Sequence, residues 1–412
     1  MRRALRSQGF TLIEMLVSMA IMTVVVTGVF SLLNPSQGTY QAQPEVSDMQ
    51  QRLRVAADSI NKDLMMAGAG MYSGNMIGTL DAYFSPLLPH RVGTIASDPA
   101  GSFRANPQCP LTCASAITIM YVPTTTAQTT IRNDMPTPSS ELKVDAQAGC
   151  PENDQLCGFK EGMRVLIMNP TGAYDIFTIT NVQDDALHLQ HRDDKFTTAY
   201  PAGSWITQIE SHTYYLEDNG TDTFRLRHYD GYKTDLPIVD NVVDFRAEFF
   251  GDPSPPLVIK PATDPQGPWT TYGPRPPGLG QDNDDDPWPV SENCLFRVDG
   301  ATGLQVPRPE IQTLGTPDAA PVLMPAAMLT DGPWCPADKN SSGDDLPNKY
   351  DADMLRVRQV RVTLRVQVAK TLLRGPAGVL FRHAGTSRGG ERFVPDQEIR
   401  FDVAPRNLNL GR

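Results

Sequence analysis

The chain has 412 residues, and its 47 acidic residues outnumber its 36 Lys and Arg residues, so the formal net charge is −11. This charge argues against non-specific nucleic-acid binding, because that affinity comes from neutralising phosphates with Lys and Arg. When the N-terminal leader and helical region (residues 1–70) are set aside, roughly 340 residues remain, enough for one large domain or two modest ones.

The N-terminus combines a short basic segment with a long apolar one. Residues 1–9 contain three arginines and no acid, and an apolar stretch then extends from Phe10 to Leu33. As a helix this stretch would measure about 36 Å, more than the roughly 30 Å of a bilayer core. We expect a cytoplasmic leader at 1–9 and a transmembrane assembly helix at 10–34. A secretory signal fits less well, because its apolar region has only about 7–15 residues.

One carboxylate, Glu14, lies near the start of the apolar stretch. A charge in hydrocarbon is costly unless it has a partner, so its presence indicates a function rather than a plain anchor. The six residues Gly9 to Glu14 read G-F-T-L-I-E and resemble the type IV prepilin signature. The resemblance implies that a prepilin peptidase cuts after Gly9 and methylates Phe10. It also implies that Glu14 is neutralised by the amino terminus of a neighbouring subunit during filament assembly.

A second helical segment is expected at 35–70. Asn34-Pro35 and Gly38 should break or loosen the first helix. An amphipathic stripe then recurs at spacings of three and four, and Gly68 and Gly70 provide stop signals. The stripe consists of Val46, Met49, Leu53, Ala56, Ile60 and Leu64. We predict a stalk helix that packs this stripe on its own domain.

The sequence after residue 70 predicts an antiparallel β-rich head, which consists of two parts at 71–250 and 351–412. Short β-branched and aromatic runs are separated by turn residues, with a hairpin at Asp218–Gly220. A long alternating strand over 360–368 should have one buried and one wet face. The expected fold class is therefore α+β and pilin-like, with a long hydrophobic helix followed by a sheet.

The segment 251–350 differs in composition, since it holds 19 of the 36 prolines and three of the four tryptophans. We expect that such a segment cannot build regular ladders. We interpret it as a Pro-rich insertion between strands of the head. It is either a solvated loop without a specific role or a surface that contacts a partner.

Six cysteines all follow the apolar segment, and an even number outside the cytosol favours disulfides. Sequence proximity favours three pairs, although six cysteines allow about 15 sets of pairings. The favoured pairs are Cys109–Cys113, Cys150–Cys157 and Cys294–Cys335. A four-cysteine zinc site formed by the first two pairs is the alternative.

Two acidic clusters raise the question of calcium. Asp338, Asn340 and Asp344 place oxygen donors around a glycine, as at the start of an EF-hand loop, but the closing Glu is missing. The run at 282–286 is denser and lacks that spacing. Solvated acidic turns are the alternative for both clusters, and no other cofactor is expected.

The catalytic signals are weak. The chain lacks an H-E-x-x-H motif, a phosphate-binding P-loop and a G-x-G-x-x-G fingerprint, and its six histidines are scattered in sequence. We do not expect an enzyme.

Several segments resemble the PilW-like minor pilins and the related J-type minor pseudopilins of type II secretion. They are Gln51–Arg54, Asp63–Leu64, Ala67–Gly68, Thr213–Tyr215 and Pro405–Leu408. This resemblance implies a low-copy subunit that helps to initiate a type IV pilus and lies at its tip. Its partners would be other minor pilins, the major pilin, an inner-membrane assembly platform and a tip adhesin. It would be a single-pass inner-membrane protein with a periplasmic C-terminal domain before it joins the surface fibre.

The sequence leaves three functions open. The first is a minor pilin, the second a minor pseudopilin of a secretion system, and the third a membrane-anchored binding or enzymatic domain unrelated to filaments. Processing of the leader separates the first two from the third, and gene neighbours separate the first from the second.

Overall fold

The structure is a computed structural model, and it describes most of the chain from Phe10 onward. The described residues are 10–70, 85–91, 109, 112–137, 141–168, 174–191, 196, 199–218, 220–231, 234–253, 278–281, 288–292, 296–307, 314, 320–330, 334–335, 350–387 and 393–408. The chain divides into two compact units. One comprises 1–52 and 366–397, and the other 53–365 and 398–412.

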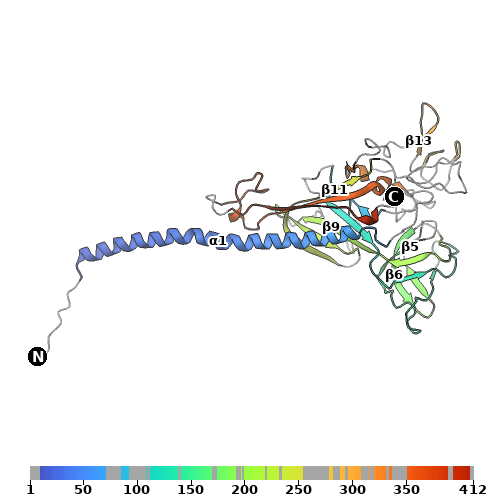
Figure 1. The fold of residues 1–412 in the computed structure, drawn as a ribbon, viewed down its shortest axis with the longest axis horizontal. Coiled ribbons are helices and arrows are strands. Elements are labelled where there is room, and N and C mark those ends of the chain that lie inside the picture. The colour runs from blue at the N-terminus through green and yellow to red at the C-terminus, as the bar shows by residue number, and fades with distance from the viewer. Residues whose placement is uncertain are drawn as a thin grey trace. The chain divides into compact units, whose positions relative to one another are not determined.

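The helix α1 (Leu12–Met66) is a single element of 55 residues (Figure 1). The predicted break at Pro35 and Gly38 is therefore wrong, and the segments 10–34 and 35–70 share one helix. A proline removes a single N–H and costs about 3 kcal/mol in a helix interior. Long helical segments on both sides, one apolar and one amphipathic, favour continuing the helix through that defect. Met66 ends the helix, and Gly68 and Gly70 follow with φ of 75° and 68°.

Hydroxyl groups in the apolar part of α1 are satisfied within the helix. Ser18 and Thr23 donate to the carbonyls of Glu14 and Met19 at 2.8 and 2.7 Å. The Thr27 hydroxyl donates in the same way to the carbonyl of Thr23, at 2.7 Å. In a membrane every polar group needs an internal partner, so this pattern is compatible with a lipid environment.

The amphipathic stripe of α1 is confirmed from Met49 onward, and Val46 at its start is only partly buried. Met49, Leu53, Ala56, Ile60 and Leu64 are all buried, at 0–5% exposure. The opposite face, with Gln51, Arg54, Asp58 and Lys62, is exposed. Burial of this stripe accounts for the second half of the helix, because tertiary packing of an apolar face supplies most helical stability.

In the first unit, the described residues 366–387 and 393–397, which we call the arm, have a small core of their own. Leu373, Phe381 and Val394 are buried there at 1–3% exposure. Lys370 Nζ lies 2.9 Å from Glu45 Oε1 of α1, which ties the arm to the helix within this unit.

The main sheet has eight strands in the order β1-β2-β9-β10-β11-β17-β18, with β14 also paired to β11. Their bounds are β1 Leu87–Leu88, β2 Ala116–Tyr121, β9 Glu210–Asp218, β10 Phe224–Tyr229, β11 Asp235–Gly251, β14 Val322–Met324, β17 Val357–Val366 and β18 Gln397–Val403. Every pairing from β1 to β11, and that of β14 with β11, is antiparallel. Together with α1 this confirms the α+β class and the predicted hairpin between β9 and β10.

A second sheet closes on itself to form a small barrel. Its six strands run in the order β3-β8-β5-β6-β7-β4. They are β3 Gln128–Thr130, β8 Trp205–Gln208, β5 Arg164–Met168, β6 Tyr174–Gln183, β7 His188–His191 and β4 Leu142–Lys143. An antiparallel bridge between Ile131 and Val144 joins the two ends of this order. The sequence predicts β5, β6, β7 and β8 but neither β3 and β4 nor the closure.

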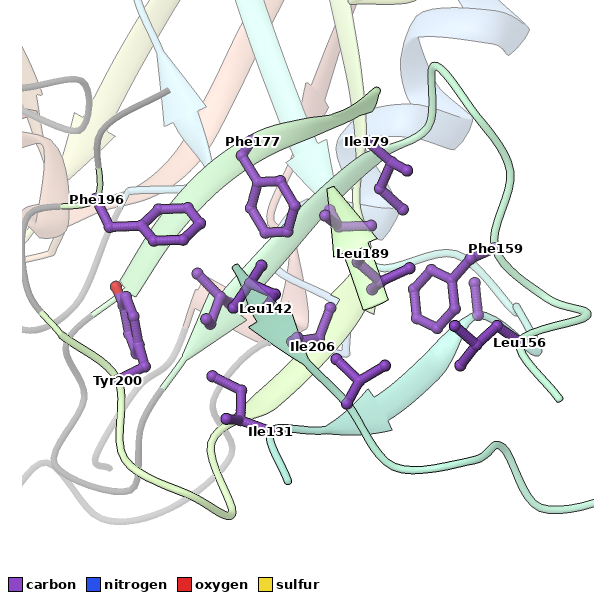
Figure 2. Close-up of a cluster of buried hydrophobic side chains, with 14 of the residues drawn as sticks. Ile131, Leu142, Leu156, Phe159, Phe177, Ile179, Leu189, Phe196, Tyr200 and Ile206 are labelled. Carbon is purple, nitrogen blue, oxygen red and sulfur yellow. The ribbon is translucent and has the colours of Figure 1, made fainter. Parts of the chain in front are cut away.

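The barrel encloses an apolar core that Figure 2 shows in close-up. Phe177, Leu189 and Ile206 from three different strands are at most 1% exposed. The Phe177 and Phe196 rings meet edge to face with centroids 5.2 Å apart. Buried Tyr200 donates a hydrogen bond of 2.7 Å to the buried Asp175 carboxylate, so each of these polar groups has a partner. The barrel therefore has a filled interior rather than a channel.

The described parts of the 251–350 insertion contain more pairing than its composition suggests. β12 (Phe296–Val298) and β13 (Gln305–Pro307) form an antiparallel hairpin, and β15 (Trp334–Cys335) pairs with β16 (Tyr350–Asp351). β14 adds to the main sheet. Short 3₁₀ turns occur here and later in the chain, at η3 (Met328–Thr330), η4 (Ala352–Arg356), η5 (Thr371–Leu373) and η7 (Arg406–Leu408). The expectation that this segment forms no ladders is therefore wrong for these pieces.

Candidate functional site

The first turn of α1 is a capping box. The Glu14 Oε2 atom accepts hydrogen bonds from the Thr11 backbone N–H at 2.9 Å and from the Thr11 hydroxyl at 2.7 Å. The Glu14 N–H donates in return to Thr11 Oγ1 at 3.4 Å. Thr at the cap and Glu three residues later satisfy N–H groups that no helical carbonyl can reach. Glu14 thus has a partner inside its own chain, a contact that we did not predict from the sequence.

The residues around this turn present a continuous apolar surface. Phe10 is 90% exposed and directly precedes the cap. The 20 residues Leu12–Ser31 have a mean hydropathy of 2.2, and none of this stretch is buried by the rest of the chain. By length and composition the helix can cross a membrane. Such a surface needs cover from lipid or from other helices.

A family model described as the prokaryotic N-terminal methylation motif matches residues 5–30. This match supports a type IV prepilin-like protein. The motif implies processing by prepilin peptidase and partners in pilus assembly, and it fits a membrane-anchored pilin. Comparison with curated proteins and with solved structures gives no significant match.

Several predicted site residues of the prepilin-like chain lie outside the described residues. Gly9, which would precede the cut, is one of them. Asp338, Asn340 and Asp344 of the calcium hypothesis are others, as is the acidic run at 282–286. The calcium hypothesis therefore stays a prediction.

Two disulfides join cysteines that are close in sequence. Cys109 is bonded to Cys113 and Cys150 to Cys157. With their sulfurs oxidised these four residues cannot supply the thiolates of the zinc alternative. Cys294 and the side chain of Cys335 are not among the described parts, so the third pair stays a prediction.

One hydrolase-type string, G-x-S-x-G, occurs at 385–389. A nucleophile elbow of that pattern needs a strand directly before the serine. The described residues before it, 374–384, contain no strand, and the Gly385 N–H donates to the Gly375 carbonyl at 2.9 Å. The local structure does not match a nucleophile elbow.

A polar cluster lies where α1 packs on the main sheet in the second unit. We call it the histidine cluster, and its central residues are Asp63 of α1, His212 of β9 and His228 of β10. His212 Nδ1 lies 2.7 Å from His228 Nε2 and 3.7 Å from Asp63 Oδ2. One ligand atom from each of the three residues lies within 4.8 Å of the others. Asp63 of α1 is therefore brought next to two histidines of the β9–β10 hairpin, which comes much later in the sequence.

Strand register explains this convergence. Residues 210, 212 and 214 share one face of β9, and His228 is directly opposite Tyr214 in the ladder. The same face carries fully buried Leu216 and, on β10, Leu226. Asp63 is on the buried stripe of α1, between Ile60 and Leu64. The cluster thus replaces apolar side chains at positions where the helix–sheet interface would otherwise be apolar.

A second layer of polar groups orients the cluster. The Tyr214 hydroxyl, fully buried, donates to Asp63 Oδ2 at 2.6 Å and lies 2.8 Å from Ser59 Oγ. On the other side of the imidazole, His212 Nε2 lies 3.3 Å from Glu210 Oε2 and 3.1 Å from the Tyr121 hydroxyl. Asp63 and His212 are therefore each held by further hydrogen-bonding groups.

Electrostatics favour the neutral forms of His228 and Tyr214 and the charged form of Glu210. Burial lowers the pKa of His228, and its neighbour His212 lowers it further. The hydrogen bond from His212 lowers the pKa of Glu210. Burial, followed by the nearby Asp63 carboxylate, raises the pKa of Tyr214. At neutral pH, His228 therefore has an available lone pair, and Tyr214 stays a hydrogen-bond donor.

These histidines are scattered in sequence, and we did not predict the cluster from it. A usable signal was present: Asp63 interrupts a helical apolar stripe, and His212 lies on the strand face that also carries Tyr214 and Leu216. Local periodicity shows that both positions face inward, but it does not show that they face each other.

Proposed function

We propose that the chain is a minor pilin that helps to initiate a type IV pilus and lies at or near its tip. The observation that carries this proposal is the methylation motif followed by an exposed apolar helix whose first turn holds Glu14. In this proposal the leader is removed, and α1 anchors the protein in the inner membrane with its C-terminal domain in the periplasm. The helix then packs among the helices of other pilins.

The size of the head supports a low-copy position. A repeating subunit must pack its head against identical neighbours along the whole fibre. This chain carries a main sheet, a separate barrel and a long insertion, which suits a place with few neighbours. The proposed partners are prepilin peptidase, other minor pilins, the major pilin, the assembly platform and a tip adhesin. We propose a structural subunit rather than an enzyme.

A minor pseudopilin of a type II secretion system is the second candidate, because it would share the motif and the helix. Deletion of the gene distinguishes the two functions. Loss of surface pili with normal secretion supports the minor pilin, and loss of secretion with normal pili supports the pseudopilin.

The assembly role of Glu14 can be separated from its capping role by three variants. Glu14→Gln keeps an oxygen that can accept the Thr11 hydrogen bonds but removes the charge. Glu14→Val removes both, and Thr11→Val removes the hydroxyl of the cap while keeping the carboxylate. If a neighbouring amino terminus neutralises Glu14, the charge is what matters, since opposite charges attract strongly in low dielectric.

We expect all three variants to be inserted and processed. Glu14→Gln and Glu14→Val should co-purify poorly with other pilins and leave few surface filaments in electron micrographs. Thr11→Val should behave nearly as wild type. Normal piliation by Glu14→Gln would contradict the charge-pair role, and a Thr11→Val defect as large as that of Glu14→Val would assign Glu14 to capping alone.

A further inference from the structure

We propose that the histidine cluster is a binding site for one divalent transition-metal ion, zinc being the best match, with Asp63, His212 and His228 as its protein ligands. The site is independent of the N-terminal motif and of the proposed function. It would link the end of α1 to β9 and β10 within the second unit.

The donor set indicates the class of metal. Two imidazole nitrogens and one carboxylate oxygen suit zinc and its neighbours in the first transition row, whereas calcium and magnesium prefer oxygen alone. Three protein ligands leave a fourth position, which water can fill. The His212 side chain is 16% exposed, so the cluster is not fully sealed from solvent.

The distances are close to those that a tetrahedral ion requires. With bonds of about 2.0–2.1 Å, neighbouring ligand atoms around zinc are about 3.3 Å apart. The distance from His212 Nδ1 to His228 Nε2 is 2.7 Å, which is shorter than this value. The distance from His212 Nδ1 to Asp63 Oδ2 is 3.7 Å, which is longer. Small rotations of the His212 and His228 side chains, which would move the two nitrogens apart, are enough to reach the separation that zinc requires. Without an ion, the two rings share an N–H···N hydrogen bond.

Protonation and orientation are also suitable. When His212 Nε2 donates to Glu210, the lone pair of the ring is on Nδ1, the atom that faces Asp63 and His228. Carboxylates behind metal-binding histidines commonly fix the tautomer in this way. Tyr214 fixes the Asp63 carboxylate by donating to it. The cluster thus has a first layer of ligands and a second layer of groups that orient them.

The test uses the full-length protein in detergent micelles after treatment with EDTA. Isothermal titration with zinc chloride should give one ion per chain, magnesium chloride should give no binding, and zinc should raise the melting temperature. His212→Ala and His228→Ala should each weaken zinc binding by at least about tenfold, and Tyr214→Phe should weaken it by about 10- to 100-fold. His383→Ala, which changes a histidine outside the cluster, is the matched control and should bind as wild type.

Cobalt provides a measurement that does not depend on how well a variant folds. Wild-type protein loaded with cobalt should show the visible absorption of a four-coordinate site, and zinc should abolish this absorption. If the wild-type protein shows neither a heat of zinc binding nor a cobalt absorption spectrum, the proposal is overturned and the cluster is only a hydrogen-bonded group. Unchanged zinc affinity in folded His212→Ala or His228→Ala protein would also overturn it.

Discussion

Arg356 is the largest fully buried side chain in the described part of the chain, and replacing it tests how the 251–350 segment is attached to the main sheet. Its guanidinium donates to Asp353 Oδ1 at 3.1 Å, with both side chains at 0% exposure. It also donates to the carbonyls of Asp252, at 2.9 Å, and Pro253. One side chain therefore joins the end of β11 to the start of β17.

Arg356→Met keeps much of the side-chain volume and removes every one of these donors. Taking away one partner of a buried ion pair costs about 3–5 kcal/mol, because the remaining charge is left uncompensated. We expect a loss of this size in the free energy of unfolding. The measurement is urea unfolding of the full-length protein in detergent, followed by tryptophan fluorescence.

Two controls make the expectation specific. Arg361→Met applies the same change to an exposed ion pair on β17, with Asp402 at 2.7 Å, and should leave stability close to wild type. A double variant, Asp353→Leu with Arg356→Met, removes both charges and should be less destabilised than Arg356→Met alone. A loss below about 1 kcal/mol for Arg356→Met would refute the argument that this buried pair is a main attachment.

Two further predictions concern the barrel and its disulfide. Phe177→Ala should lower the free energy of unfolding by about 3–5 kcal/mol, because it leaves a cavity in the barrel core. Hydrogen exchange should accelerate more in β5 and β6 than in β9 and β10. Equal acceleration in both sheets would contradict a separate barrel. Replacing both Cys150 and Cys157 by Ser should lower the free energy of unfolding by about 2 kcal/mol, because the unfolded chain is no longer constrained by the short disulfide loop. Wild-type protein with a reductant is the comparison. A double-serine protein as stable as the oxidised wild type would contradict that contribution.

Local periodicity predicted the elements whose pattern repeats over many residues. The stripe from Met49 to Leu64 and the alternation on β17 are visible in the sequence because burial repeats every three to four residues in a helix and every two in a strand. On β17, Val360, Val362 and Leu364 are fully buried as predicted. Thr363 is also buried, at 2%, so the other face is covered there as well.

Features that depend on distant parts of the chain were not predictable in this way. The barrel closes through Ile131 and Val144, next to strands of three and two residues that are too short to show a period. The histidine cluster joins residues that are far apart in sequence, as in the Tyr214–Asp63 hydrogen bond with its separation of 151. The continuity of α1 through Pro35 does not follow from the local sequence, because proline and glycine are helix breakers there. The long helical segments on both sides carry the helix across them.

The processing of the N-terminus tests the central claim most directly. The measurement is the intact mass and N-terminal residue of the protein isolated from cells that make prepilin peptidase, beside a Gly9→Val variant as the uncleaved control. The prepilin assignment predicts that residues 1–9 are absent, that the chain begins with N-methylated Phe10, and that the Gly9→Val protein keeps its leader. A native protein that still carries residues 1–9, or one whose new terminus lies after the apolar segment, would contradict it.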